Sequence, residues 1–163
     1  MAVWTVYLSL CLLVALTASG SLNGSGWLVT GKVCWAGWTA FGCRCFKFFN
    51  NAQMWVNAEK LCLRFDGNLA SVHSHEEYTF IQNLIRSETQ DSTRAWIGGH
   101  DAVHEGVWLW SDGSEMNFQI WSPGEPNNLH GQNCLEMNFD CKFSTMDSRS
   151  DRFSTMSFRK LEL

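Results

Sequence analysis

Six cysteines between positions 34 and 141 constrain this chain more than any other feature, because cross-links between them restrict the folds that it can adopt. An even number of cysteines in an oxidising compartment predicts disulfides, although many pairings are open. A zinc site is the alternative, but the two closest cysteines are separated by one residue and no histidine pair follows at zinc-motif spacing. The six are Cys34, Cys43, Cys45, Cys62, Cys134 and Cys141.

The first 20 residues have the pattern of a secretory signal peptide. Residues 3–16 are almost wholly apolar and uncharged, and the small residues 17–20 follow them. A membrane anchor is the alternative, but the apolar run is shorter than the roughly 20 residues that a spanning helix needs. We therefore predict a signal peptide at 1–20, an N-terminal extension at 21–33, and a secreted, extracellular protein without a membrane span.

Size and charge narrow the class of protein further. About 140 residues remain after the leader, which is enough for one domain with one core. The net charge of -4 argues against nucleic acid as a partner, because that ligand favours a basic surface. Nine Trp, eleven Phe and thirteen Gly are typical of a small extracellular domain with an aromatic core and glycine-rich loops.

The chain alternates between compact elements and one long irregular stretch. Apolar residues recur at helical spacing over 53–65, and a second helix begins at Ser74, where Glu77 completes a capping box. Residues 117–133 have no periodicity, and a loop of this length in a compact domain is usually functional or disordered. Short strands are predicted at 45–49, 95–99, 107–110 and 135–139, so the pattern indicates an α+β domain.

Several motifs occur in order between Cys34 and Phe139. They are Asn68-Leu69-Ala70-Ser71-Val72-His73, Trp96-Ile97-Gly98-Gly99 and Trp121-Ser122-Pro123-Gly124-Glu125-Pro126-Asn127-Asn128. On these motifs the chain resembles the C-type lectin-like domains, in the style of soluble fish lectins and type II antifreeze proteins. The resemblance implies a disulfide-braced, double-loop α+β domain with two helices and a small antiparallel sheet at 34–139.

The same resemblance implies roles for the cysteines. It pairs Cys34 with Cys45 across the opening hairpin, and it makes Cys62 and Cys134 half-cystines as well. Cys43 is an additional thiol that could exchange with Cys45 or link two chains into a homo-oligomer.

The loop chemistry can also be argued from the residues themselves. Calcium takes 6–8 oxygen ligands, and Glu125 and Asn127 offer one carboxylate and one amide oxygen on either side of Pro126. Taken alone this segment could be a polar turn. The resemblance implies that Glu125, Asn127 and Asn128 bind carbohydrate, and that Glu125, Asn127 and position 132 bind Ca²⁺. The Glu-Pro-Asn order resembles the mannose type.

The chain departs from the family pattern in three ways. The third ligand position holds the neutral Gln132, the Trp-Asn-Asp triplet that supplies two further ligands is absent, and so is the closing strand with its cysteine. We therefore expect the domain to be incomplete at its C-terminal end, with an atypical polar tail at 140–163. Any calcium binding should be weak.

The motifs lead to two expected functions. The first is calcium-dependent binding of glycans, for example on microbial surfaces in innate recognition. The second is a non-sugar binder, such as an ice-binding or protein-binding relative on the same scaffold. None of the five His residues lies in a nucleophile or zinc motif, so we expect no enzyme.

Overall fold

The computed structural model describes residues 34–160, so the predicted signal peptide and the extension at 21–33 lie outside the described residues. No helix within 34–160 is both long and apolar enough to cross a bilayer. The elements are β1 (Thr39–Phe41), β2 (Arg44–Gln53), α1 (Trp55–Leu63), β3 (Asn68–Leu69), α2 (His75–Thr89), β4 (Ala95–His100), β5 (Leu109–Trp110), β6 (Cys134–Phe139), β7 (Lys142–Met146) and β8 (Phe153–Lys160).

The strands form one sheet in the order β1-β2-β8-β4-β6-β7, to which β3 is added beside β8 and β5 beside β4. The β4–β8 pair is parallel, and the other described pairs of named strands are antiparallel. The predicted α+β class with two helices is confirmed, while the sheet is mixed where the sequence predicted an antiparallel one.

Helix α2 begins where the sequence predicted it. Ser74 caps the helix by accepting a hydrogen bond from the backbone N–H of Glu77 at 3.1 Å, which is one half of the predicted capping box. The Glu77 carboxylate accepts from the backbone N–H of His73 at 2.8 Å and pairs with Arg44 of β2. The start of the helix is therefore capped by Ser74 and also held to strand β2 by the Arg44–Glu77 ion pair.

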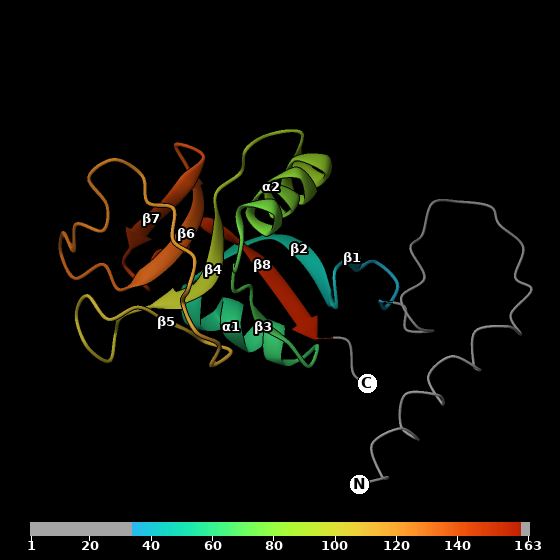
Figure 1. Cartoon of the computed structure of the whole chain (residues 1–163), viewed down its shortest axis with the longest axis horizontal. Helices are drawn as coiled ribbons and strands as arrows, with labels where there is room; N and C mark the ends of the chain where they lie inside the picture. The colour runs from blue at the N-terminus through green and yellow to red at the C-terminus, as the bar shows by residue number, and fades with distance from the viewer. Residues whose placement is uncertain (1–33, 161–163) are drawn as a thin grey trace, which may run out of the picture.

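The two helices cover different clusters of buried side chains. Figure 1 shows α2 above and α1 below the central strands β2, β8 and β4. Tyr78, Ile81 and Ile85 of α2 belong to the larger hydrophobic cluster, and Ala58 and Cys62 of α1 belong to the smaller one. The sheet thus separates two cores, each closed by one helix.

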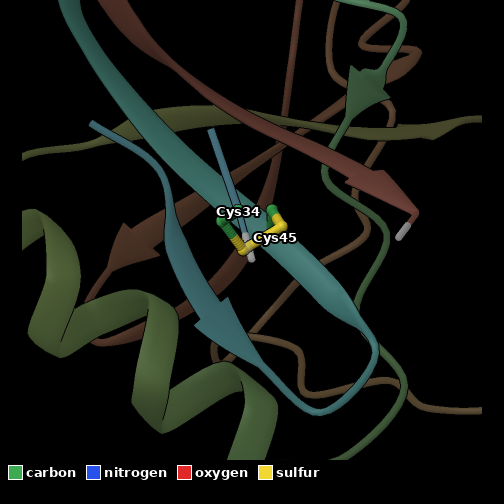
Figure 2. Close-up of a disulfide and its surroundings, with 2 residues drawn as sticks. All are labelled: Cys34 and Cys45. Carbon is green, nitrogen blue, oxygen red and sulfur yellow. A yellow bond between two sulfur atoms is a disulfide. The ribbon is translucent and has the colours of Figure 1, made fainter. Parts of the chain in front are cut away.

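One disulfide braces the opening of the domain. Cys34 is joined to Cys45 of β2 with an S–S distance of 2.01 Å, as the resemblance implies. Figure 2 shows this bond linking the start of the described chain to β2 beside the β1–β2 hairpin. Cys43 lies exposed at the tip of that hairpin as a free thiol.

The expectation that Cys62 and Cys134 are half-cystines is corrected by the structure. Both are buried free thiols in the smaller core cluster. The side chain of Ser157 in β8 contacts Cys62, so a hydroxyl stands where a cysteine partner would be needed. Cys134 lies opposite Met146 of β7, which also has no thiol to offer.

The structure differs most from the prediction at the C-terminal end. Instead of an incomplete domain with a polar tail at 140–163, residues 142–146 form β7 and residues 153–160 form β8. Strand β8 lies between β2 and β4 in the middle of the sheet and is buried except for Lys160. The repeated Phe-Ser-Thr-Met segments at 143–146 and 153–156 both fall on strands.

The polar residues of β8 are buried because neighbouring segments satisfy their hydrogen bonds. Thr155 Oγ1 accepts from Gln53 Nε2 at 2.8 Å, and the Ser157 hydroxyl donates to the backbone carbonyl of Asn68 at 3.2 Å. Phe153, Met156 and Phe158 of the same strand enter the hydrophobic clusters. A serine- and threonine-rich strand can therefore lie inside the sheet without unsatisfied hydroxyls.

Candidate functional site

The long loop between β5 and β6 is fixed at its root to β7. The backbone N–H of Ser122 donates to the carbonyl of Phe143 at 2.8 Å, and that of Phe143 donates to the carbonyl of Ile120 at 2.8 Å. The Ser122 hydroxyl donates to the carbonyl of Phe139 at 2.7 Å. In Figure 1 the loop projects beside β6 and β7, at the end of the molecule away from β1. Residues 123–131 therefore rise from a well-anchored base.

Glu125 and Asn127 lie together near the tip of this loop. The Glu125–Pro126 peptide bond is cis. Asn127 Nδ2 donates to Glu125 Oε1 at 2.7 Å, and Asn127 Oδ1 accepts from the backbone N–H of Leu129 at 2.9 Å. Asn127 and Asn128 are exposed, and Glu125 is half-buried. The loop thus presents a carboxylate acceptor and an amide donor side by side at the surface.

Thr145 of β7 contacts two of the predicted site residues, although no sequence motif points to it. Its hydroxyl donates to Glu125 Oε2 at 2.6 Å, and its backbone N–H donates to the same oxygen at 3.1 Å. The hydroxyl also lies 3.1 Å from Gln132 Oε1. Thr145 therefore connects Glu125 with Gln132. The sequence does not single it out, because β7 (Lys-Phe-Ser-Thr-Met) has no apolar–polar alternation and its three central residues are all buried.

An ion pair is buried directly behind these residues. Glu136 of β6 is fully buried, and its carboxylate accepts two hydrogen bonds from Arg94 and one from the Ser144 hydroxyl. The Arg94 guanidinium stacks over the rings of Phe139 and Phe153. Burial lowers the pKa of Arg94, and the nearby charge of Arg152 lowers it further. The Glu136 carboxylate therefore already accepts hydrogen bonds from Arg94 and Ser144 and does not face the loop as a free ligand.

The oxygen donors at the loop do not fit a calcium ion. Calcium takes 6–8 oxygen ligands and is bound more tightly as more of them are charged. Glu125 is the only carboxylate among the three predicted ligands, and both of its oxygens already accept hydrogen bonds. Asn127 Oδ1 is held by Leu129, and Gln132 Oε1 faces the Thr145 hydroxyl. Among residues 34–160, no three His, Cys, Asp or Glu side chains are grouped to hold a metal.

A cleft of about 470 Å³ lies next to β7, and none of the predicted site residues lines it. It is open to solvent, and its charged side chains include three arginines and two aspartates, of which Asp147 forms an ion pair with Arg149. Hydrogen bonds from Arg149 lower the pKa of Asp147 to about 2. The lining residues are Arg94, Met146, Asp147, Arg149, Ser150, Asp151, Arg152 and Phe153.

Comparison with known proteins gives matches over most of the chain. A family model described as "Lectin C-type domain" matches residues 51–155. The galactose-specific lectin nattectin of Thalassophryne nattereri is 45% identical over 68% of this chain and 70% of that protein. Ladderlectin of Oncorhynchus mykiss is 48% identical over 65% of this chain, but this covers only 56% of that protein.

Solved structures of this fold differ in their dependence on calcium. A calcium-independent type II antifreeze protein superposes with a TM-score of 0.72 and 30% sequence identity, covering 80% of this chain and 97% of that one. A type II antifreeze protein described as Ca²⁺-dependent superposes with a TM-score of 0.71 and 27% sequence identity, covering 78% of this chain and 100% of that one.

Proposed function

This chain belongs to the C-type lectin domain family, and we propose that it is a binding protein that recognises carbohydrate through Glu125, Asn127 and Asn128. One observation carries the proposal: Glu125 Oε1 and Asn127 Nδ2 lie 2.7 Å apart on a projecting loop. A sugar hydroxyl that replaces this internal hydrogen bond can donate to Glu125 and accept from Asn127.

We propose a mannose-type preference on the order of the two polar residues. Because Glu125 precedes Pro126 and Asn127 follows it, the carboxylate acceptor lies on one side of the proline and the amide donor on the other. Nattectin, whose name describes it as galactose-specific, makes galactose the natural competitor in any test.

We further propose that the glycans are those of microbial surfaces and that the protein is secreted after loss of residues 1–20. Intact-mass analysis of the secreted chain would show whether that leader is removed.

Exchanging the two loop residues tests the sugar preference. Glu125→Gln with Asn127→Asp moves the charged acceptor to the other side of Pro126 and keeps the net charge. The variant should shift the preference from mannose towards galactose by about tenfold, the effect of about 1.4 kcal/mol. Glycan-array binding, with calcium and with a chelator, is the measurement.

The control carries the same chemical changes at exposed positions away from the loop. Glu105→Gln with Asn51→Asp should leave the array profile as it is in the wild type. If the loop exchange leaves the ratio of mannose to galactose binding unchanged, then Glu125 and Asn127 do not set the preference.

Calcium is a minor contributor in this proposal. A single carboxylate cannot supply the charge of a tight site, so any calcium dependence of glycan binding should be weak. A second candidate is a non-sugar binder such as an ice-binding protein, because type II antifreeze proteins share this fold and are similar in sequence. Thermal hysteresis measured on the full chain distinguishes the two: ice binding produces a freezing-point gap, and glycan binding does not.

We also propose that two copies can be linked through Cys43. This thiol is free and exposed at the tip of the β1–β2 hairpin, where a second copy can reach it. A covalent dimer on a non-reducing gel that disappears in Cys43→Ser, but persists in Cys141→Ser, would support the link.

A further inference from the structure

We infer that Thr145 takes the place of a cation at the loop, so that the Glu125 site is held together and works without calcium. This inference has two parts. The sugar-binding half, that the site binds sugar without calcium, rests on the proposed function. The metal half, that the site does not bind calcium, rests on the geometry of Glu125, Gln132 and Thr145 alone.

Thr145 satisfies the carboxylate that a cation would otherwise neutralise. Its backbone N–H and its hydroxyl both donate to Glu125 Oε2, at 3.1 Å and 2.6 Å. Hydrogen bonds to an ionised acceptor are shorter and stronger than neutral ones, and 2.6 Å lies within the range for a hydroxyl donating to a carboxylate. Glu125 Oε1 receives the third donor, Asn127 Nδ2. The charge of Glu125 is therefore stabilised by three protein donors.

The threonine hydroxyl is fixed in position by the sheet. Thr145 is 2% exposed and pairs with Leu135 in the β6–β7 ladder, and its neighbour Ser144 is bonded to the buried Glu136. A side chain held in this way cannot swing aside without disturbing the strand. The Thr145 side of this contact is buried, which strengthens a direct hydrogen bond to the carboxylate.

The neutral Gln132 is consistent with this arrangement. Its Oε1 faces the same Thr145 hydroxyl at 3.1 Å, so Glu125 and Gln132 converge on one hydroxyl group. A second carboxylate at this position would place two negative charges around one neutral donor, which is unfavourable unless a cation lies between them. Thr145 and Gln132 together thus make a site that is complete without a metal.

Calcium titration calorimetry on the full chain tests the metal half. Wild type should give no saturable binding up to about 1 mM calcium, the weak end of extracellular calcium modules. Thr145→Asp with Gln132→Glu places three carboxylates around the same point and should bind calcium at least about tenfold more tightly. Thr39→Asp, on an exposed position of β1, adds one of these two charges elsewhere and should bind no better than wild type.

Because Thr145 is buried, near-UV circular dichroism should first establish that the Asp variant is folded. Gln132→Glu alone provides a second route, since Gln132 is half-exposed and its replacement leaves the core intact. With a second carboxylate at the site, this variant should bind calcium more tightly than wild type. Saturable calcium binding by wild type below 1 mM would overturn the inference, as would charge-adding variants that fold but gain no affinity.

Glycan binding separates failure of this inference from failure of the proposed function. Equal binding of wild type to a mannose-type ligand in calcium and in chelator supports both. Binding that is lost in chelator overturns the metal-free site and leaves the lectin function intact. A wild type that binds neither calcium nor any glycan contradicts the proposed function, while the metal half of the inference remains supported.

Discussion

Glu136 depends on one ion-pair partner for the balance of its charge. It is fully buried, and its charge is balanced by Arg94, whose side chain is 34% exposed. Removing one partner of a buried ion pair leaves an uncompensated charge in a medium of low polarity. Glu136 lies on β6 and Ser144 on β7, so the ion pair also supports the strand that carries Thr145.

Replacing Arg94 by Met should lower the free energy of unfolding by about 2–4 kcal/mol, somewhat less than for a completely buried pair because Arg94 is partly exposed. Urea unfolding measures this loss. The double change Arg94→Met with Glu136→Gln removes the unpaired charge and should recover part of the stability. If the double variant is no more stable than Arg94→Met, the charge of Glu136 is not the cause.

At the scale of elements, β8 determines whether the sheet is continuous. It pairs with β2 along most of its length and with β3 and β4 as well. The side chain of Ser157 in this strand contacts Cys62 of α1. The strand and the helix are therefore close enough for a covalent link if the serine is replaced by cysteine.

Ser157→Cys should form a disulfide with Cys62 and raise the free energy of unfolding by about 2–4 kcal/mol, because the bond closes a long loop in the unfolded chain. Peptide mapping without reduction identifies the bond, and urea unfolding measures the gain. Ser154→Cys is the matched control, since the Ser154 hydroxyl faces Asn50 and its thiol should remain free. A free thiol at position 157 would contradict the prediction.

The elements also show what could be predicted from the sequence. Helix α2 was predictable because its cap, at Ser74 and Glu77, and its apolar spacing are local signals. Strands β7 and β8 were not, because their serines and threonines become buried only when distant residues such as Gln53 and Asn68 supply partners. The contact of Thr145 with Glu125 could not be predicted for the same reason, because the two residues are 20 positions apart in the sequence. Glu125 and Asn127 could be recognised because they lie in one continuous motif.

At the scale of the whole molecule, the free thiols of residues 34–160 divide into a surface class and a core class. Cys43 and Cys141 are exposed on separate hairpins, whereas Cys62 and Cys134 are buried in the smaller core cluster. Burial raises the pKa of both Cys62 and Cys134 to about 12. The reactive form is the thiolate, so a raised pKa leaves very little of it at pH 8.

Native alkylation at pH 8 should therefore label Cys43 and Cys141 and leave Cys62 and Cys134 unlabelled. In urea without reductant, the two core thiols should also react, because their pKa values return towards about 8.5 when they are exposed. Mass spectrometry of tryptic peptides counts the labels. Protection of Cys62 and Cys134 that persists in urea would mean that they are oxidised, and not merely buried.

The central place of β8 has a consequence for biosynthesis. Every other described element is translated before β8, yet β8 joins β1-β2 on one side to β4-β6-β7 on the other. Until it emerges from the ribosome, the nascent polypeptide has two partial sheets with open edges on β2 and β4, and such edges are templates for aggregation. Folding should then be slow, since its decisive contacts join segments far apart in the chain.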